Sequence, residues 1–181
     1  MGGQFSMHMW TSITVGFIFA FPFILWEIWK FISPALYENE KKYAASFIII
    51  SSFLFFVGVL FGYYLIAPLS VQFFASYIVS PEINNSIDID SYISLMKTSA
   101  IASGLLFELP IIIFFLTKIG LVNPEFLRKY RKYTLIIVLI LSAIITPPDV
   151  ISQVIVAIPI MILYEASILI SVLVVKNQEK E

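Results

Sequence analysis

Long apolar stretches alternate with short polar segments along this 181-residue chain. The five stretches cover approximately residues 10–29, 43–67, 94–116, 133–146 and 150–175. A helix needs about 20 mostly apolar residues to cross the hydrocarbon core of a bilayer, which is about 30 Å thick. The pattern therefore predicts an all-α, polytopic membrane protein in which residues 1–181 form a single integral membrane domain with five transmembrane helices.

Individual segments refine this prediction. Residues 69–80 are apolar on much of their circumference, which favours a separate interfacial helix lying on the bilayer. The fourth stretch is short and ends at Pro147 and Pro148, so we expect it to thin the membrane or to be sheltered by neighbours. Pro159 is expected to break the fifth stretch.

The composition agrees with a lipid environment. Hydrophobic residues make up 60% of the chain, charged residues 13%, and the mean hydropathy is +0.95, whereas about a quarter of the residues of a soluble domain are charged. The chain has no cysteine, which excludes disulfides and thiol chemistry. The net charge of −1 gives no indication of a nucleic-acid partner, and none is predicted.

The basic residues predict an orientation. Ten of the eleven Lys and Arg residues lie between the first and second stretches, between the third and fourth, or in the C-terminal tail. The positive-inside rule places these segments, and the C-terminus, in the cytoplasm. The N-terminus would then lie outside, although residues 1–9 contain no Lys or Arg. We therefore expect that a preceding transmembrane helix is missing from this chain.

Two glutamates interrupt the apolar stretches. Glu108 and Glu165 lie at a similar predicted depth in the third and fifth spans. Ionisable residues inside a membrane are costly and are functional candidates. Each could hydrogen-bond to a neighbouring helix of the same chain, or contact a partner helix or a translocating segment.

Other polar residues leave alternatives open. Glu38 and Glu40 could form weak surface ion pairs beside Lys41 and Lys42, or could bind the guanidinium of an arginine. Gln153 could make an interhelical hydrogen bond or receive a polar group from another transmembrane helix.

Sequence motifs of enzymes are missing. The single histidine, His8, has no assigned role, and neither an HExxH motif nor a nucleophile elbow nor a phosphate-binding loop occurs. We predict no catalytic residues, no metal and no cofactor, so the protein is not expected to be an enzyme.

Four ordered motifs resemble one family. Residues 31–42, FISPALYENEKK, resemble the first cytoplasmic loop of the C subunit of the twin-arginine protein translocase (TatC), in which FxxPAL precedes acidic and basic residues. The segments that match its later helices and loops are 105–110 (LLFELP), 128–133 (RKYRKY) and 146–153 (TPPDVISQ). The family has six helices, so this chain would contain helices two to six.

The resemblance implies a function without covalent chemistry. Members of the family are receptors for the twin-arginine signal peptides of folded export substrates in the bacterial inner membrane. They form the assembly core of a translocase driven by the proton-motive force. Glu40 would bind arginine, beside Glu38, and Phe31 and Pro34 would shape that loop.

The same resemblance implies several partners. Single-span subunits of the TatA and TatB type would dock near Thr146, Asp149 and Gln153, Glu108 would lie inside the concave bundle, and the protein would self-associate in the receptor complex. The alternative is a secondary transporter or channel subunit, with Glu108 and Glu165 in an ion or proton path. The absence of inverted repeats argues against a transporter.

Overall fold

The computed structural model describes residues 2–32, 44–78, 88–147 and 149–178. All of the regular secondary structure in these residues is helical, so the predicted all-α class is confirmed. The elements are α1 (Gly2–Ile32), α3 (Ala44–Phe61), the π-helical turn η2 (Gly62–Ile66), α4 (Ala67–Ser76), α5 (Ile89–Phe107), α6 (Leu109–Lys118), α7 (Pro124–Lys129), α8 (Arg131–Ile145) and α9 (Val150–Gln178).

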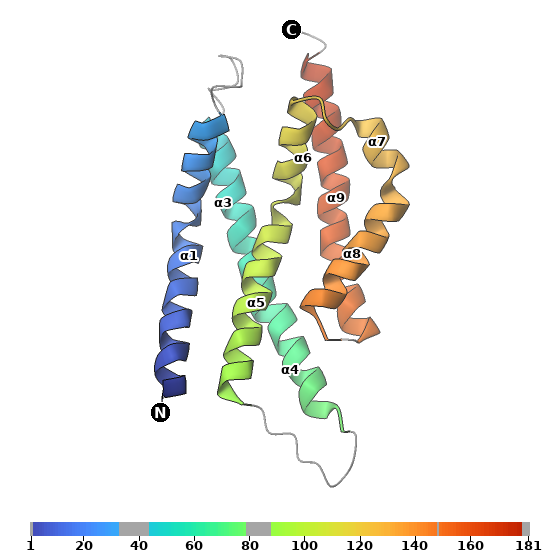
Figure 1. The fold of residues 1–181 in the computed structure, drawn as a ribbon. Helices are drawn as coiled ribbons and strands as arrows, with labels where there is room; N and C mark the ends of the chain where they lie inside the picture. Colours follow the sequence, from blue (N-terminus) through green and yellow to red (C-terminus); the bar gives the residue numbers. More distant parts are fainter. Residues whose placement is uncertain (1, 33–43, 79–87, 148, 179–181) are drawn as a thin grey trace.

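The helices run lengthwise in one bundle (Figure 1). The closely packed pairs are α3 with α5, α6 with α9, α1 with α3 and α8 with α9. The carboxyl ends of α1, α6 and α9 lie at one end of the bundle together with α7 (Figure 1). Lys30, Lys118 and Lys176 are in the last turns of those three helices, and we call this the basic end.

Four helical segments of the described chain are long and apolar enough to cross a membrane: Gly3–Phe31, Ser46–Ser76, Ile89–Lys118 and Val150–Gln178. The remaining predicted span corresponds to α8, which has only 15 residues. At 1.5 Å per residue, α8 is about 22 Å long, less than the hydrocarbon thickness of about 30 Å. In the described chain, four of the five predicted spans are therefore long enough to cross the membrane, and α8 is a shorter helix in place of the other.

Two proline-containing segments differ from the sequence predictions. The chain continues without interruption from α3 through η2 into α4, so no separate interfacial helix begins at residue 69. The N–H of Ala67 donates to the carbonyl of Gly62 five residues earlier, and this wider turn accommodates Pro68, which has no N–H to donate. Likewise α9 passes through Pro159 as one helix.

Glycines let α3 and α5 pack backbone to backbone. A Cβ on Gly58 would lie 2.7 Å from the carbonyl oxygen of Ser103, and one on Gly104 would lie 2.8 Å from the ring of Phe55. The hydroxyl of Ser103 also donates to the carbonyl of Gly58 at 2.7 Å. Small residues and polar bonds of this kind hold transmembrane helices together, because apolar burial gives little driving force in lipid.

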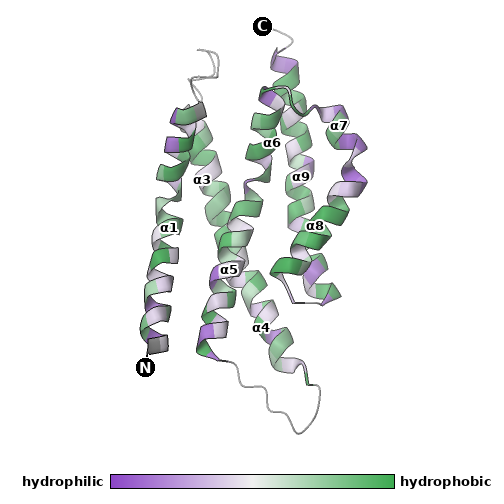
Figure 2. Ribbon diagram, in the orientation of Figure 1, coloured by the Kyte–Doolittle hydropathy of each residue, from purple (hydrophilic) through white to green (hydrophobic). Residues whose placement is uncertain are grey.

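Most of the helical ribbon consists of hydrophobic residues (Figure 2), and many of their large side chains are exposed. Phe23 of α1 is 75% exposed and Ile144 of α8 is 74% exposed, as expected for side chains that face lipid. The buried side chains between the helices form three clusters, around Phe21 and Phe55, around Val156 and Ile160, and around Tyr164.

Candidate functional site

The predicted arginine-binding loop lies mostly outside the described residues. Pro34, Glu38 and Glu40 fall in the gap between α1 and α3. Phe31 is described: it lies in the last turn of α1, at the basic end, and 86% of its surface is exposed. The last described turn before this gap therefore lies at the basic end.

Glu108 lies at the junction between α5 and α6. Pro110 has no N–H to donate, and the helix is interrupted at Glu108, whose own N–H donates to the carbonyl of Leu105 at 3.2 Å. The side chain of Glu108 is buried and accepts a hydrogen bond from the hydroxyl of Ser51 in α3. Its second carboxyl oxygen, Oε1, has no partner among the described residues.

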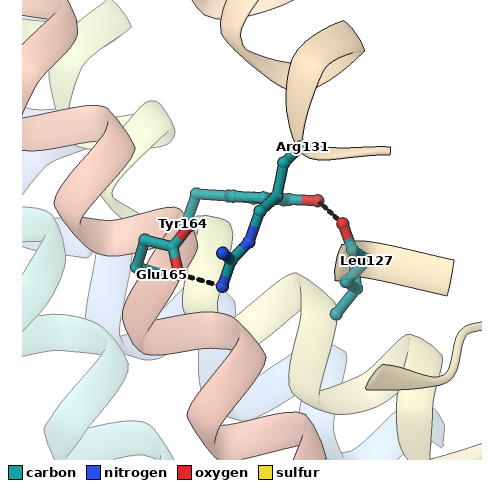
Figure 3. Close-up of polar contacts among 4 residues, drawn as sticks. All are labelled: Leu127, Arg131, Tyr164 and Glu165. Atoms are coloured by element: carbon teal, nitrogen blue, oxygen red, sulfur yellow. Dashed lines mark hydrogen bonds and ion pairs between the residues drawn. The ribbon is translucent and has the colours of Figure 1, made fainter. Parts of the chain in front are cut away.

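Glu165 has a different environment. Its carboxylate accepts a hydrogen bond from the guanidinium of Arg131 at 2.6 Å, and both side chains are about half exposed (Figure 3). The preceding residue, Tyr164, donates its hydroxyl to the carbonyl of Leu127 at 2.9 Å. The structure therefore does not join the two glutamates: Glu108 binds α3, whereas Glu165 binds the start of α8.

Thr146, Asp149 and Gln153 lie around the turn between α8 and α9, and each has a partner within the chain. Thr146 is buried and donates to the carbonyl of Ser142 at 2.8 Å. Gln153 donates its amide nitrogen to the carbonyl of Leu139 in α8 at 2.7 Å, so the predicted interhelical hydrogen bond is present.

Asp149 caps the first turn of α9. One carboxylate oxygen accepts hydrogen bonds from both the N–H and the hydroxyl of Ser152, each at 2.9 Å. These bonds lower the pKa of Asp149 below its usual value because they stabilise the carboxylate, and the bond from the N–H has the larger effect. The acceptor lies three residues before the donor, which is the usual spacing of a helix N-cap.

An open pocket of about 550 Å³ lies between the first turns of α5 and the last turn of α8. Its polar lining comes from α5 and its apolar lining includes Ile144 and Ile145. The pocket was not predicted from the sequence, although the hydroxyl residues of α5 recur at helical spacing, which places them on one face of the helix. The polar residues are Asp90, Ser91, Ser94, Thr98 and Ser99.

No group of three His, Cys, Asp or Glu side chains in the described part of the chain could hold a metal ion. Glu108, Glu165, Thr146, Asp149 and Gln153 each form a hydrogen bond within the described chain, either between helices or within a helix or turn. The bonds between helices hold the bundle together.

Residues 1–159 match the family profile described as Sec-independent protein translocase protein (TatC). The protein of that name from Blattabacterium sp. subsp. Periplaneta americana is 46% identical over 176 residues, which cover 97% of this chain and 66% of that protein. TatCy of Bacillus subtilis is 40% identical over 174 residues, which cover 96% of this chain and 68% of that protein. The chain thus spans about two thirds of the length of these curated relatives.

Two solved structures resemble more than nine tenths of the chain. A crystal structure of the twin-arginine translocase receptor TatC in DDM has a TM-score of 0.77 and 38% identity, covering 92% of this chain and 74% of that chain. A second crystal structure of the same receptor has a TM-score of 0.75, covering 94% and 75%.

Proposed function

We propose a function from one established premise: this chain belongs to the TatC family of Sec-independent protein translocase proteins. The proposal is that it acts as a receptor for twin-arginine signal peptides and as the assembly core for export of folded proteins. The observation that carries the proposal is the likeness, over 92% of the chain, to a structure described as a twin-arginine translocase receptor. Translocation would use the proton-motive force across a bacterial inner membrane.

The proposed peptide site is the loop after α1. Glu38 and Glu40 supply two carboxylates close in sequence to the exposed Phe31 at the basic end. A carboxylate binds the planar guanidinium of arginine through two parallel hydrogen bonds, which a lysine cannot reproduce. In this proposal Glu40 is the main arginine ligand, Glu38 assists it, and Phe31 and Pro34 shape the loop.

The proposed partner site is the turn between α8 and α9. The side chains of Val150 and Ile151 there are 72% and 70% exposed, so an apolar surface surrounds the polar residues. Gln153 uses its amide nitrogen within the chain, and its amide oxygen has no donor among the described residues. A polar group on a single-span TatA- or TatB-type helix could donate to that oxygen, and self-association would complete the receptor complex.

The alternative function, an ion or proton path through Glu108 and Glu165, has less support. Glu165 is paired with Arg131, and Glu108 is buried against Ser51. A path would require the two carboxylates to line one continuous polar route, and their recorded partners lie on different helices.

The proposed receptor is tested by peptide binding to the purified protein in nanodiscs. Glu40→Gln is expected to weaken binding of a twin-arginine peptide by about 1.5–3 kcal/mol, the usual value of a charge-assisted hydrogen bond. Glu38→Gln is the matched control and should have a smaller effect, and a peptide with two lysines should bind weakly to all three proteins. Equal affinities of the wild type and Glu40→Gln for the arginine peptide would contradict the assignment.

A further inference from the structure

A basic corner joins α7 to α8 at the basic end of the bundle. We define it by Arg128, Lys129 and Lys132 together with the aromatic residues Phe126, Tyr130 and Tyr133. Leu127 attaches the corner to the bundle, because its side chain is only 6% exposed and lies in the cluster that contains Tyr164. The hydrogen bond from Tyr164 to the carbonyl of Leu127 fixes its backbone as well (Figure 3).

Three cations of the corner are exposed, and the ammonium of one of them, Lys129, lies 5.9 Å from the centroid of the Tyr130 ring. Arg131 lies among them in sequence, but it is paired with Glu165. Arg128, Lys129 and Lys132 are exposed, and none of them has an ion-pair partner within the described chain. In Figure 2, α7 and its junction with α8 have hydrophilic colouring, and the apolar part of α8 follows directly.

The aromatic residues form an exposed row beside these cations. The ring centroids of Phe126 and Tyr130 lie 4.4 Å apart, and those of Tyr130 and Tyr133 lie 5.7 Å apart. Their side chains are 48%, 37% and 62% exposed, respectively. Tyrosine rings favour the level of the lipid headgroups, because one edge is polar and the body is apolar.

The basic corner lies only a short distance along α8 from side chains that are expected to contact lipid. Ile136, Ile137 and Ile140 of α8 are more than half exposed and therefore face lipid. They follow Lys132 by only one to two helical turns, which is about 6–12 Å along the axis. In a bilayer whose acyl chains contact these isoleucines, the cations would lie just beyond the acyl chains, at the level of the lipid phosphates.

We propose that the basic corner is a binding site for the headgroups of anionic phospholipids. The guanidinium of Arg128 and the ammonium groups of Lys129 and Lys132 would donate to phosphodiester oxygens, while the aromatic row contacts the upper acyl chains. A lipid fits better than an acidic protein segment, because the apolar faces of Phe126 and Tyr133 need an apolar partner beside the charges. This site does not depend on the proposed receptor function.

The test compares charge variants that change the net charge equally. The protein is reconstituted in nanodiscs of phosphatidylglycerol and phosphatidylcholine, and retained lipids are counted by native mass spectrometry. Lys129→Gln/Lys132→Gln should retain phosphatidylglycerol about thirtyfold less at low ionic strength, because each cation near an anionic surface contributes about a fivefold factor. The control is Lys30→Gln/Lys176→Gln, which removes two cations elsewhere at the basic end and should retain the lipid as the wild type does.

Further measurements separate the site from general effects of charge or folding. Lys129→Arg/Lys132→Arg should retain the lipid, and salt at about 0.5 M should release it from the wild type, because the Debye length is then only a few ångströms. Equal losses in the two glutamine variants, or retention that salt does not change, would overturn the proposal. Displacement of the lipid by a polyglutamate peptide that binds more tightly would also overturn it and identify an acidic protein partner instead.

Discussion

Arg131 at the start of α8 and Glu165 in α9 form an ion pair in which a guanidinium nitrogen lies 2.6 Å from a carboxylate oxygen (Figure 3). The adjacent Tyr164 bonds to Leu127 of α7. Two neighbouring residues of α9 thus hold both sides of the α7–α8 junction. Since α8 packs mainly on α9, these contacts fix the end of α8 that lies near the basic end.

We expect this ion pair to give a measurable coupling. In a double-mutant cycle with Arg131→Gln and Glu165→Gln, the coupling free energy should be about 0.5–1 kcal/mol, because both side chains are half exposed. Unfolding in mixed detergent micelles followed by circular dichroism measures it. The control pair Glu27 and Lys30, which is more exposed and spaced i,i+3, should give about 0.3 kcal/mol. Strictly additive effects at Arg131 and Glu165 would show that their contact contributes nothing.

The close contact between α3 and α5 predicts that a larger residue at position 58 destabilises the protein. A Cβ at this position would lie 2.7 Å from a backbone oxygen and 2.8 Å from the Cα of Gly104, and neither atom can move without shifting a helix. Gly58→Ala should therefore lower the free energy of unfolding by about 1–3 kcal/mol.

The control for this prediction is Gly16→Ala in α1. A Cβ there would meet no atom within 4 Å, and alanine is a better helix former than glycine, so the variant should be neutral or slightly more stable. Thermal unfolding of both variants in the same detergent makes the comparison. A stable Gly58→Ala protein would mean that α3 and α5 separate more easily than their packing indicates.

The lowered pKa of Asp149 predicts that the stability of the folded protein depends on pH. Its pKa is lower in the folded protein than in the unfolded chain, so its cap stabilises the fold above the unfolded pKa, which is about 3.9. The stabilisation is lost as the pH falls through the folded value. Asp149→Ala should therefore be less stable than the wild type at pH 7, and the difference should shrink below about pH 4.

Asp149→Asn separates capping from charge. Asparagine caps a helix about as well as aspartate, so this variant should remain close to the wild type in stability at pH 7. Hydrogen exchange of the amides of residues 150–153 reports the first turn of α9 directly. An exchange rate in Asp149→Asn as high as in Asp149→Ala would show that the charge, rather than the acceptor oxygen, holds the turn.

The fold was predictable where one local pattern decides the structure. Uninterrupted apolar stretches predict the long helices, and Pro147 with Pro148 marks the end of the short one. The continuation through Pro68 was not predictable from proline alone, because it depends on a π-turn that starts at Gly62, where α3 and α5 are in close contact. A proline has different effects according to the packing around it.

The contacts of the polar residues also fall into two classes: those between residues close in sequence, which can be predicted, and those between distant residues, which cannot. The cap of Asp149 joins residues three apart, so the sequence predicts it. The partners of Glu108 and Glu165 are 57 and 34 residues away, and only the packing of α5 on α3 and of α8 on α9 selects Ser51 and Arg131. Four cations lie between residues 128 and 132, and nothing local distinguishes the one that Glu165 binds.

Gln153 provides the test of the proposed partner site. Its half-buried side chain bonds to Leu139, while the neighbouring Val150 and Ile151 are exposed to lipid. A photocrosslinker at Gln153 should capture a single-span TatA- or TatB-type partner in membranes that contain one. A hydrogen bond to the free amide oxygen would contribute about 0.6–2 kcal/mol, enough to favour this position over an apolar one.

The matched control is the same crosslinker at Leu169, which lies on the same helix with 65% of its surface exposed but has no polar side chain to offer. It should react with lipid. Gln153→Leu should reduce partner crosslinking from a probe at the neighbouring Val150, since the loss removes the acceptor and leaves the apolar surface. Capture of the partner at Leu169, with only lipid adducts at Gln153, would place the docking surface nearer the basic end of α9.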